Sequence, residues 1–259
     1  MAKGSEVAHE HGFQRSRANL KFQGRLVGAL RGRACYAILT NMQSARWSDF
    51  GSAERRDEAN SHVEFDESTD RVLLEWLRVV TRDWPEAARE LEGKLGENPG
   101  RISRAFHEML SGYSSTPGEV LTIALEVPAG GHHGLVAANH IQFLSFCAHH
   151  FLPFFGCVDV VYEPDSQIVG IGKIPRLVDC RARRFQLQEL LVRELSEDMM
   201  MYAQAKGVYV RATAQHTCVC YRGPGQAMVV NTATYSLGTL NSPDRFDEIV
   251  MAMRNREPA

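Results

Sequence analysis

Apolar side chains recur at helical spacing over three stretches between residues 70 and 109. The first repeats at intervals of three and four residues, at Val72, Leu73, Trp76, Leu77 and Val80. The second follows Pro85, a residue that suits the first turn of a helix. The third covers Arg101–Met109 and comes directly after a turn signal at 98–100. We therefore predict three helices, which form an N-terminal helical region over residues 69–114.

Beyond this region, apolar and β-branched residues form extended runs separated by turn signals. The predicted strands are 119–127, 135–146, 157–162, 168–171, 208–221 and 227–237. The pair 157–162 and 168–171 is expected to form a hairpin around the turn at 163–166. Helices are predicted over 183–202 and 243–253. This order indicates an α+β fold with antiparallel strand pairs and segregated helices, in a domain over residues 115–259.

The first 68 residues lack a sustained apolar period. Residues 11–48 hold seven basic side chains and no acidic one, whereas residues 49–67 hold seven acidic ones. We predict a poorly ordered extension over residues 1–68, with one short helix near 24–40. Two alternatives remain open. An organelle transit peptide is one, although Glu6 and Glu10 count against it. The other is a contact arm for an acidic partner.

Composition narrows the classes of protein that this chain can be. The 259 residues carry 29 basic and 31 acidic side chains, so the formal net charge of −2 argues against a strongly basic nucleic-acid binder. No run of about 18 apolar residues exists, so we expect no membrane span. Six cysteines are too few for a disulfide scaffold, and no secretory leader precedes them. We therefore predict a cytoplasmic protein with reduced cysteines and neither nucleic-acid nor membrane partners.

Two short clusters of cysteine and histidine lie in the second half of the chain, at 147–150 and 216–218. Alternate residues of a strand share one face. In the strand predicted over 208–221, that row comprises Val208, Val210, Ala212, Ala214, His216, Cys218 and Cys220. Its apolar members are expected to face the core, and His216 and Cys218 lie toward the strand end, where a pocket can open.

Thiolate and imidazole ligands together favour zinc among the common metals. Cys147, His150 and Cys218 supply three ligands and leave a fourth position for water, as in a catalytic site. His149 and His216 then stand beside the metal as proton carriers, because imidazole titrates near neutral pH. These residues indicate metal-assisted hydrolysis. Either cluster taken alone is more often a set of core and surface residues.

Four blocks in order, 147–156, 168–178, 186–191 and 215–223, resemble those of type I GTP cyclohydrolase. The segment Asn-Pro-Gly-Arg-Ile-Ser-Arg-Ala-Phe upstream and Thr-Ala-Thr-Tyr-Ser-Leu-Gly downstream extend the resemblance over about residues 98–256. It implies the tunnelling fold (T-fold), with pentameric barrels stacked as a homodecamer and active sites between subunits. It also implies an enzyme that opens the imidazole ring of GTP, releases formate and makes 7,8-dihydroneopterin triphosphate.

The resemblance also implies roles for individual residues. Cys147, His150 and Cys218 become the ligands of Zn²⁺, and His149 and His216 the proton-transfer residues. Glu189, beside Gln188, holds the guanine edge, because one carboxylate can accept from both N1–H and the 2-amino group. The triphosphate is held by four cations, which are Arg101, Lys173, Arg176 and Arg222.

Two positions depart from the family pattern. Ala148 stands where the family has a glutamate, and Gly172 where it has a serine. The first change removes a partner that could orient the neighbouring imidazoles. The second threatens the late rearrangement of the ribose more than the hydrolysis. Two alternatives therefore stay open beside the family reaction. One is a divergent enzyme that stalls at a ring-opened pyrimidine triphosphate or uses another purine nucleotide. The other is a non-catalytic nucleotide-binding paralogue.

Overall fold

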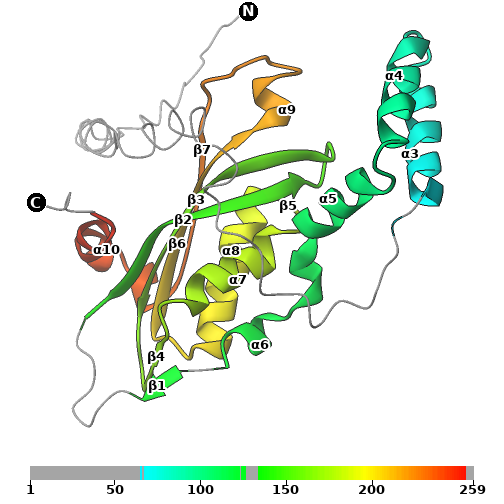
Figure 1. Ribbon diagram of the computed structural model, residues 1–259. Coiled ribbons are helices and arrows are strands. Elements are labelled where there is room, and N and C mark those ends of the chain that lie inside the picture. Colours follow the sequence, from blue (N-terminus) through cyan, green and yellow to red (C-terminus); the bar gives the residue numbers. More distant parts are fainter. Residues whose placement is uncertain (1–64, 66, 123, 127–133, 255–259) are drawn as a thin grey trace, which may run out of the picture. The chain divides into compact units, whose positions relative to one another are not determined.

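A computed structural model of the chain describes residues 65, 67–122, 124–126 and 134–254 (Figure 1). The predicted N-terminal extension therefore lies outside the described residues, apart from 65, 67 and 68, and so does the short helix expected near 24–40. Three N-terminal helices are confirmed, namely α3 (Glu67–Val80), α4 (Pro85–Leu95) and α5 (Arg101–Met109).

The turn into α5 depends on one glycine. Gly100 has a φ of 73°, and a Cβ at this position would lie 2.2 Å from the backbone oxygen of Phe65. A side chain is therefore excluded by both the left-handed backbone and the space. The amide of Gly100 donates a hydrogen bond of 2.7 Å to the buried carboxylate of Asp70 in α3, which ties the start of α5 to that helix.

The central sheet has five strands in the order β5-β2-β3-β6-β7 (Figure 1). Four of them pair antiparallel, namely β2 (Val136–Cys147), β3 (Leu152–Glu163), β6 (Gly207–His216) and β7 (Asn231–Gly238). The short strand β5 (Phe185–Gln186) pairs parallel to the last two residues of β2. This arrangement confirms the predicted α+β class and is compatible with a T-fold.

The predicted hairpin of 157–162 with 168–171 is wrong. Strand β4 (Gln167–Val169) pairs instead with β1 (Ala124–Glu126) in a separate two-stranded sheet. Both edges of β3 are taken, by β2 and by β6, so no ladder remains for β4. The strand expected over 119–127 is also shorter, because Thr116 and Glu119 form a capping box that starts the helical turn α6 (Pro117–Val120).

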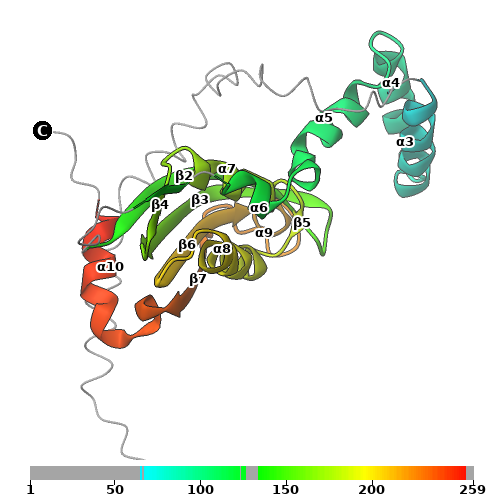
Figure 2. The ribbon, with the colours of Figure 1, turned by 90° about the horizontal axis from the view of Figure 1, so that it is seen from below.

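Helices α7 (Lys173–Ala182) and α8 (Gln188–Tyr202) cover one face of the sheet (Figure 2). Their apolar side chains pack on every second residue of the inner strands, so that Leu191, Leu195 and Met199 share a core with Val158 and Val210. The prediction missed α7, and α8 begins at residue 188 rather than 183 because β5 and the extended Leu187 occupy the intervening residues.

The other face of the sheet carries the C-terminal helix. Val161 points opposite to Val160 and packs with Leu240, Ile249 and Met253 in a second, smaller core. Leu240 comes from the 3-10 turn η3 (Thr239–Asn241), and Ile249 and Met253 come from α10 (Phe246–Met253). Two further 3-10 turns are η2 (Ser111–Ser114) and η4 (Pro243–Arg245). Among the described residues, no helix combines the length and the apolar character needed to cross a membrane.

Candidate metal centre and active site

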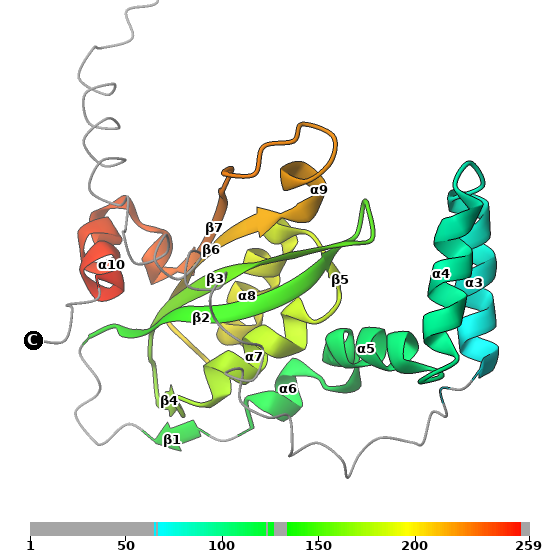
Figure 3. The ribbon, with the colours of Figure 1, turned by 45° about the horizontal axis from the view of Figure 1, so that its top comes forward.

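Three potential metal ligands converge where the central strands end. Cys147 is the last residue of β2, His150 lies in the turn that follows it, and Cys218 lies in the helical turn α9 (Thr217–Cys220) after β6 (Figure 3). One ligand atom from each, a Sγ or a ring nitrogen, lies within 4.8 Å of the other two. The sequence prediction thus named the three side chains that the tertiary structure brings together.

The spacing of these ligand atoms is compatible with an ion in tetrahedral coordination. Ligands of tetrahedral zinc lie roughly 3.6 Å apart for a sulfur and a nitrogen and roughly 3.8 Å for two sulfurs, given the usual bond lengths. The Sγ of Cys147 lies 3.8 Å from Nδ1 of His150. Burial, together with the neighbouring Cys147, raises the pKa of the Cys218 thiol. A cation bound between the thiols would reverse this effect by stabilising their thiolates, so the group could hold a metal ion.

Strand register explains why residues 71 positions apart in the chain meet. Cys147 pairs with Leu152 across the β2–β3 ladder, and Phe154 pairs with His216 across the β3–β6 ladder. The hydroxyl of Thr217 donates a hydrogen bond of 2.7 Å to the carbonyl of Pro153, which holds the start of α9 against β3. Strand β3 therefore positions both parts of the metal group, by which we mean Cys147, His150 and Cys218.

The expected row of alternating side chains does not extend past residue 216. Strand β6 ends at His216, and Thr217–Cys220 form a helical turn, so Cys218 and Cys220 do not continue one strand face. The apolar part of the row is confirmed, since Val208, Val210 and Ala212 are buried in the main core. Cys220 is also buried but lies outside the group of three ligands.

His216 is held on two sides. Its ring stacks on Phe154, with 4.3 Å between the ring centroids and 5° between the planes. Its Nε2 lies 2.9 Å from the amide oxygen of Gln188. Burial lowers the pKa of His216, and the negative charge of Glu189 opposes that effect. His216 is therefore kept mainly neutral near pH 7 and can accept a proton. His149 is exposed in the β2–β3 turn, where the centroid of its ring lies 6.1 Å from the ring centroid of His150.

The residues expected to contact substrate differ in placement. Gln188 and Glu189 open α8, where Gln188 is 3% exposed and Glu189 is exposed. Arg222, exposed just after α9, lies close enough for its charge to act on Cys218. Lys173 and Arg176 lie in the first turn of α7, and Arg101 opens α5. Within the described residues, neither a hydrogen bond nor an ion pair joins these last three to the metal group.

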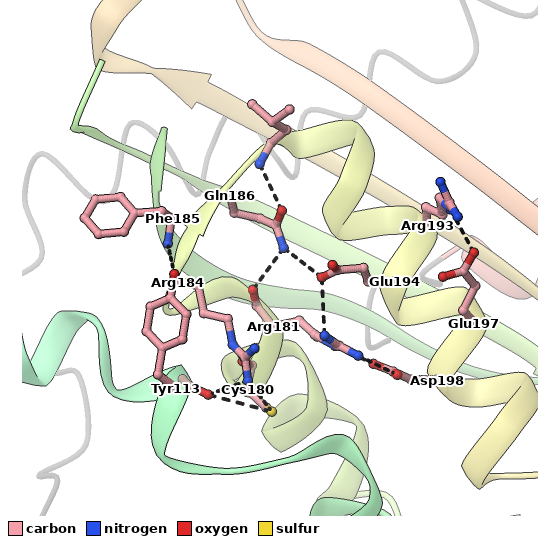
Figure 4. Close-up of polar contacts among 12 residues, drawn as sticks. Tyr113, Cys180, Arg181, Arg184, Phe185, Gln186, Arg193, Glu194, Glu197 and Asp198 are labelled. Atoms are coloured by element: carbon pink, nitrogen blue, oxygen red, sulfur yellow. Dashed lines mark hydrogen bonds and ion pairs between the residues drawn. The ribbon is translucent and has the colours of Figure 1, made fainter. Parts of the chain in front are cut away.

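A buried polar network that the sequence reasoning missed holds the segment between α7 and α8 (Figure 4). The Gln186 side chain donates to Glu194 (2.9 Å) and accepts from the Leu187 amide (3.0 Å). Arg181 makes two hydrogen bonds to Asp198, of 2.7 and 2.8 Å. The backbone carbonyl of Gln186 accepts from Ala148, directly after Cys147. The network therefore supports the metal group and the start of α8 together. The one signal of this network in the sequence is a charged residue, Asp198, at a core-facing position of α8.

Comparisons with known proteins identify the family. The family model for GTP cyclohydrolase I matches residues 85–254. The GTP cyclohydrolase 1 of Campylobacter lari is 44% identical over 136 residues, which cover 52% of this chain and 70% of that protein. The GTP cyclohydrolase 1 of Brucella anthropi is 37% identical over 171 residues, which cover 65% and 76%.

Among solved structures, the archaeosine synthase QueF-Like in its apo form aligns at 20% identity with a TM-score of 0.34, over 41% of this chain and 96% of that one. So low a TM-score supports no conclusion. The match to the GTP cyclohydrolase I family model covers well over half of the chain, and both relatives are themselves named GTP cyclohydrolase 1. The chain therefore belongs to the GTP cyclohydrolase I family of hydrolases.

Proposed function

We propose that this chain is a zinc-dependent GTP cyclohydrolase that hydrolyses the imidazole ring of GTP, releases formate and forms 7,8-dihydroneopterin triphosphate. The observation that carries the proposal is the convergence of Cys147, His150 and Cys218, with their ligand atoms within 4.8 Å of one another. The family match to GTP cyclohydrolase I supplies the substrate class. Two sulfurs and an imidazole favour zinc over the harder divalent ions.

Bound to these three ligands, zinc would supply the Lewis acidity that activates water near neutral pH. His216, held neutral by burial, accepts a proton during ring hydrolysis, and the exposed His149 can return one to the departing nitrogen. Glu189 accepts from N1–H and the 2-amino group of guanine. Arg222, Lys173, Arg176 and Arg101 bind the triphosphate, whose charge of about −4 calls for several cations.

Among the residues that the structure describes, the sheet has open edges, which favour assembly from several copies. Strand β5 covers only Phe146 and Cys147 of β2, and within the described residues β7 pairs with β6 alone. Open edges invite pairing with another chain. We propose that copies of this chain pair through these edges into pentameric barrels, and that two barrels stack as a decamer. Native mass spectrometry of the full chain would test this, and a stable monomer at micromolar concentration would overturn it.

Gly172 favours a second candidate, an enzyme that opens the ring and stalls. Gly172 precedes α7 with no side-chain cap, and a Cβ built there meets nothing within 4 Å. The position is therefore open where the family pattern has a serine hydroxyl that could act on phosphate or ribose. Ala148 likewise brings no carboxylate to the turn that holds His149 and His150.

One experiment separates the candidates. Zinc-loaded protein is incubated with GTP, and formate, pterin absorbance and product masses are followed together. Formate and dihydroneopterin triphosphate in equal amounts support the family reaction. Formate or a ring-opened mass without pterin supports the stalled enzyme. GTP binding with no change in the nucleotide would overturn both and leave a non-catalytic nucleotide-binding protein or an enzyme for another purine nucleotide.

A further inference from the structure

The amide of Gln188 has three hydrogen-bond partners inside the protein. Its Nε2 donates to the carbonyls of Ala212 (2.8 Å) and Asn231 (3.1 Å), which lie on β6 and β7. Its Oε1 lies 2.9 Å from Nε2 of His216. The side chain is 3% exposed, so water does not compete for these bonds. Both donors and one acceptor position of the amide are thus occupied within the fold.

These partners decide which way the amide faces. Two carbonyl oxygens can only accept, so the NH₂ group must point toward Ala212 and Asn231. The amide oxygen must then point toward His216, and an oxygen can only accept. In the neutral ring of His216, Nε2 therefore carries the hydrogen and Nδ1 carries the lone pair. Backbone carbonyls of two strands thereby set the tautomer of a histidine at the active site.

The ring has a second constraint, which sets its plane. Phe154, fully buried on the neighbouring strand β3, stacks on His216 with only 5° between the ring planes. Stacking alone permits a ring flip, which would turn Cε1 instead of Nε2 toward Gln188, whereas the hydrogen bond to Nε2 does not permit it. The two contacts together leave one orientation with Nδ1 as the ring's proton acceptor.

We infer that Gln188 is a positioning residue, which fixes the tautomer and orientation of His216 so that Nδ1 accepts the proton, rather than a residue that contacts guanine. The inference rests on the proposed function for its catalytic consequence. Its structural part, that His216 is the Nε2–H tautomer, can be tested whether or not the protein turns over GTP. A role in binding guanine would require the buried amide to give up bonds that hold β6 and β7 to α8. The exposed neighbour Glu189 is free of that constraint.

The test uses three variants of the full chain. Gln188→Met keeps the volume and removes all three bonds. Gln188→Glu keeps an acceptor for Nε2–H but loses both donors to the carbonyls of Ala212 and Asn231, and its place at the first residue of a helix offsets only part of the cost of its charge. Gln186→Met removes a second buried glutamine, two residues away, that does not contact His216.

The first readout needs no turnover. Solid-state ¹⁵N NMR of protein labelled at histidine reports which ring nitrogen is protonated, and a His216→Asn variant assigns the signal. We expect the Nε2–H tautomer in the parent, in Gln188→Glu and in Gln186→Met, and a mixture of tautomers in Gln188→Met. An unchanged tautomer in Gln188→Met would overturn the inference, whether or not the protein turns over GTP.

The second readout separates positioning from substrate contact. Loss of an orienting partner costs roughly 10- to 100-fold in activity, so we expect Gln188→Met to lower kcat by that factor and to change KM less than about twofold. In an inactive His216→Asn background, adding Gln188→Met should leave the Kd for GTP unchanged. A Kd or KM that rises about tenfold with kcat preserved would make Gln188 a substrate contact and overturn the inference.

Discussion

The Sγ of Cys147 and the Nδ1 of His150 lie 3.8 Å apart across the turn that follows β2. This separation is close to that expected between two ligands of one tetrahedral zinc ion. The end of β2 and the turn after it supply two of the three ligands, and a helical turn after a different strand supplies the third, Cys218. Metal affinity should therefore depend on the β2–β3 and β3–β6 ladders as well as on the ligands.

The two neighbouring cysteines of α9 should behave differently. Cys218→Ser removes a ligand and should weaken zinc binding by more than the roughly 10- to 100-fold that loss of an outer partner costs. Cys220→Ser should keep zinc, because Cys220 is buried outside the group. Zinc content after dialysis against a weak chelator, measured by mass spectrometry, checks both. Zinc retained in Cys218→Ser and lost in Cys220→Ser would show that the ligand is misassigned.

Gly172→Ser should increase the yield of pterin per formate if the missing hydroxyl limits the late rearrangement. The added side chain meets no atom within 4 Å, and the φ of −75° is allowed for serine, so the fold should accept it. Gly172→Ala fills the same space without a hydroxyl and is the matched control. Chromatography of the products checks the ratio. Equal pterin yields from parent, alanine and serine variants would remove Gly172 as the cause of any stall.

The ion pair between Arg181 and Asp198 should contribute much more to stability than the exposed pair between Arg193 and Glu197 in α8. Asp198→Ala leaves a partly buried guanidinium that faces the more distant carboxylate of Glu194, at 3.6 Å, so we expect a loss of about 3 kcal/mol. Glu197→Ala removes the exposed pair with Arg193 and should change stability little. Urea unfolding checks both variants (Figure 4). Equal losses would show that burial does not decide the contribution.

Glu163 should make stability depend on pH in the acid range. Its hydrogen bond from Thr239, and then its contacts with Arg245, hold the pKa of Glu163 below its ordinary value of 4.5. The unfolded chain therefore takes up this proton first as the pH falls. The stabilisation is complete above pH 4.5 and is lost as the pH falls through the lowered pKa.

Glu163→Gln tests this linkage. The variant should be less stable than the parent by about 1 kcal/mol near neutral pH, and the difference should shrink on acidification. Glu248→Gln, which removes another partner of Arg245, should keep the acid dependence that Glu163 contributes. Urea unfolding at several pH values checks it. A constant difference between parent and Glu163→Gln at all pH values would contradict the assignment.

Local pattern predicted the fold class and most elements, because helical and strand periodicity are properties of neighbouring residues. The bounds of α5 agree with the prediction at both ends. Errors arose where local pattern is ambiguous. Residues 183–187 look helical, but Phe185 and Gln186 form β5, since they pair with the end of β2. The strand predicted over 208–221 ends at His216, just before α9 begins, because a pattern of alternating side chains does not mark where a strand stops.

The types and order of Cys147, His150, His216 and Cys218 can be read without coordinates, and they suffice to predict a metal site of sulfur and imidazole ligands. How these groups are held depends on the fold. The Gln188 amide bonds residues 24, 28 and 43 positions away, and β4 pairs with β1 because β3 has no free edge. Such contacts join residues far apart in the chain, and no local pattern of residues encodes them.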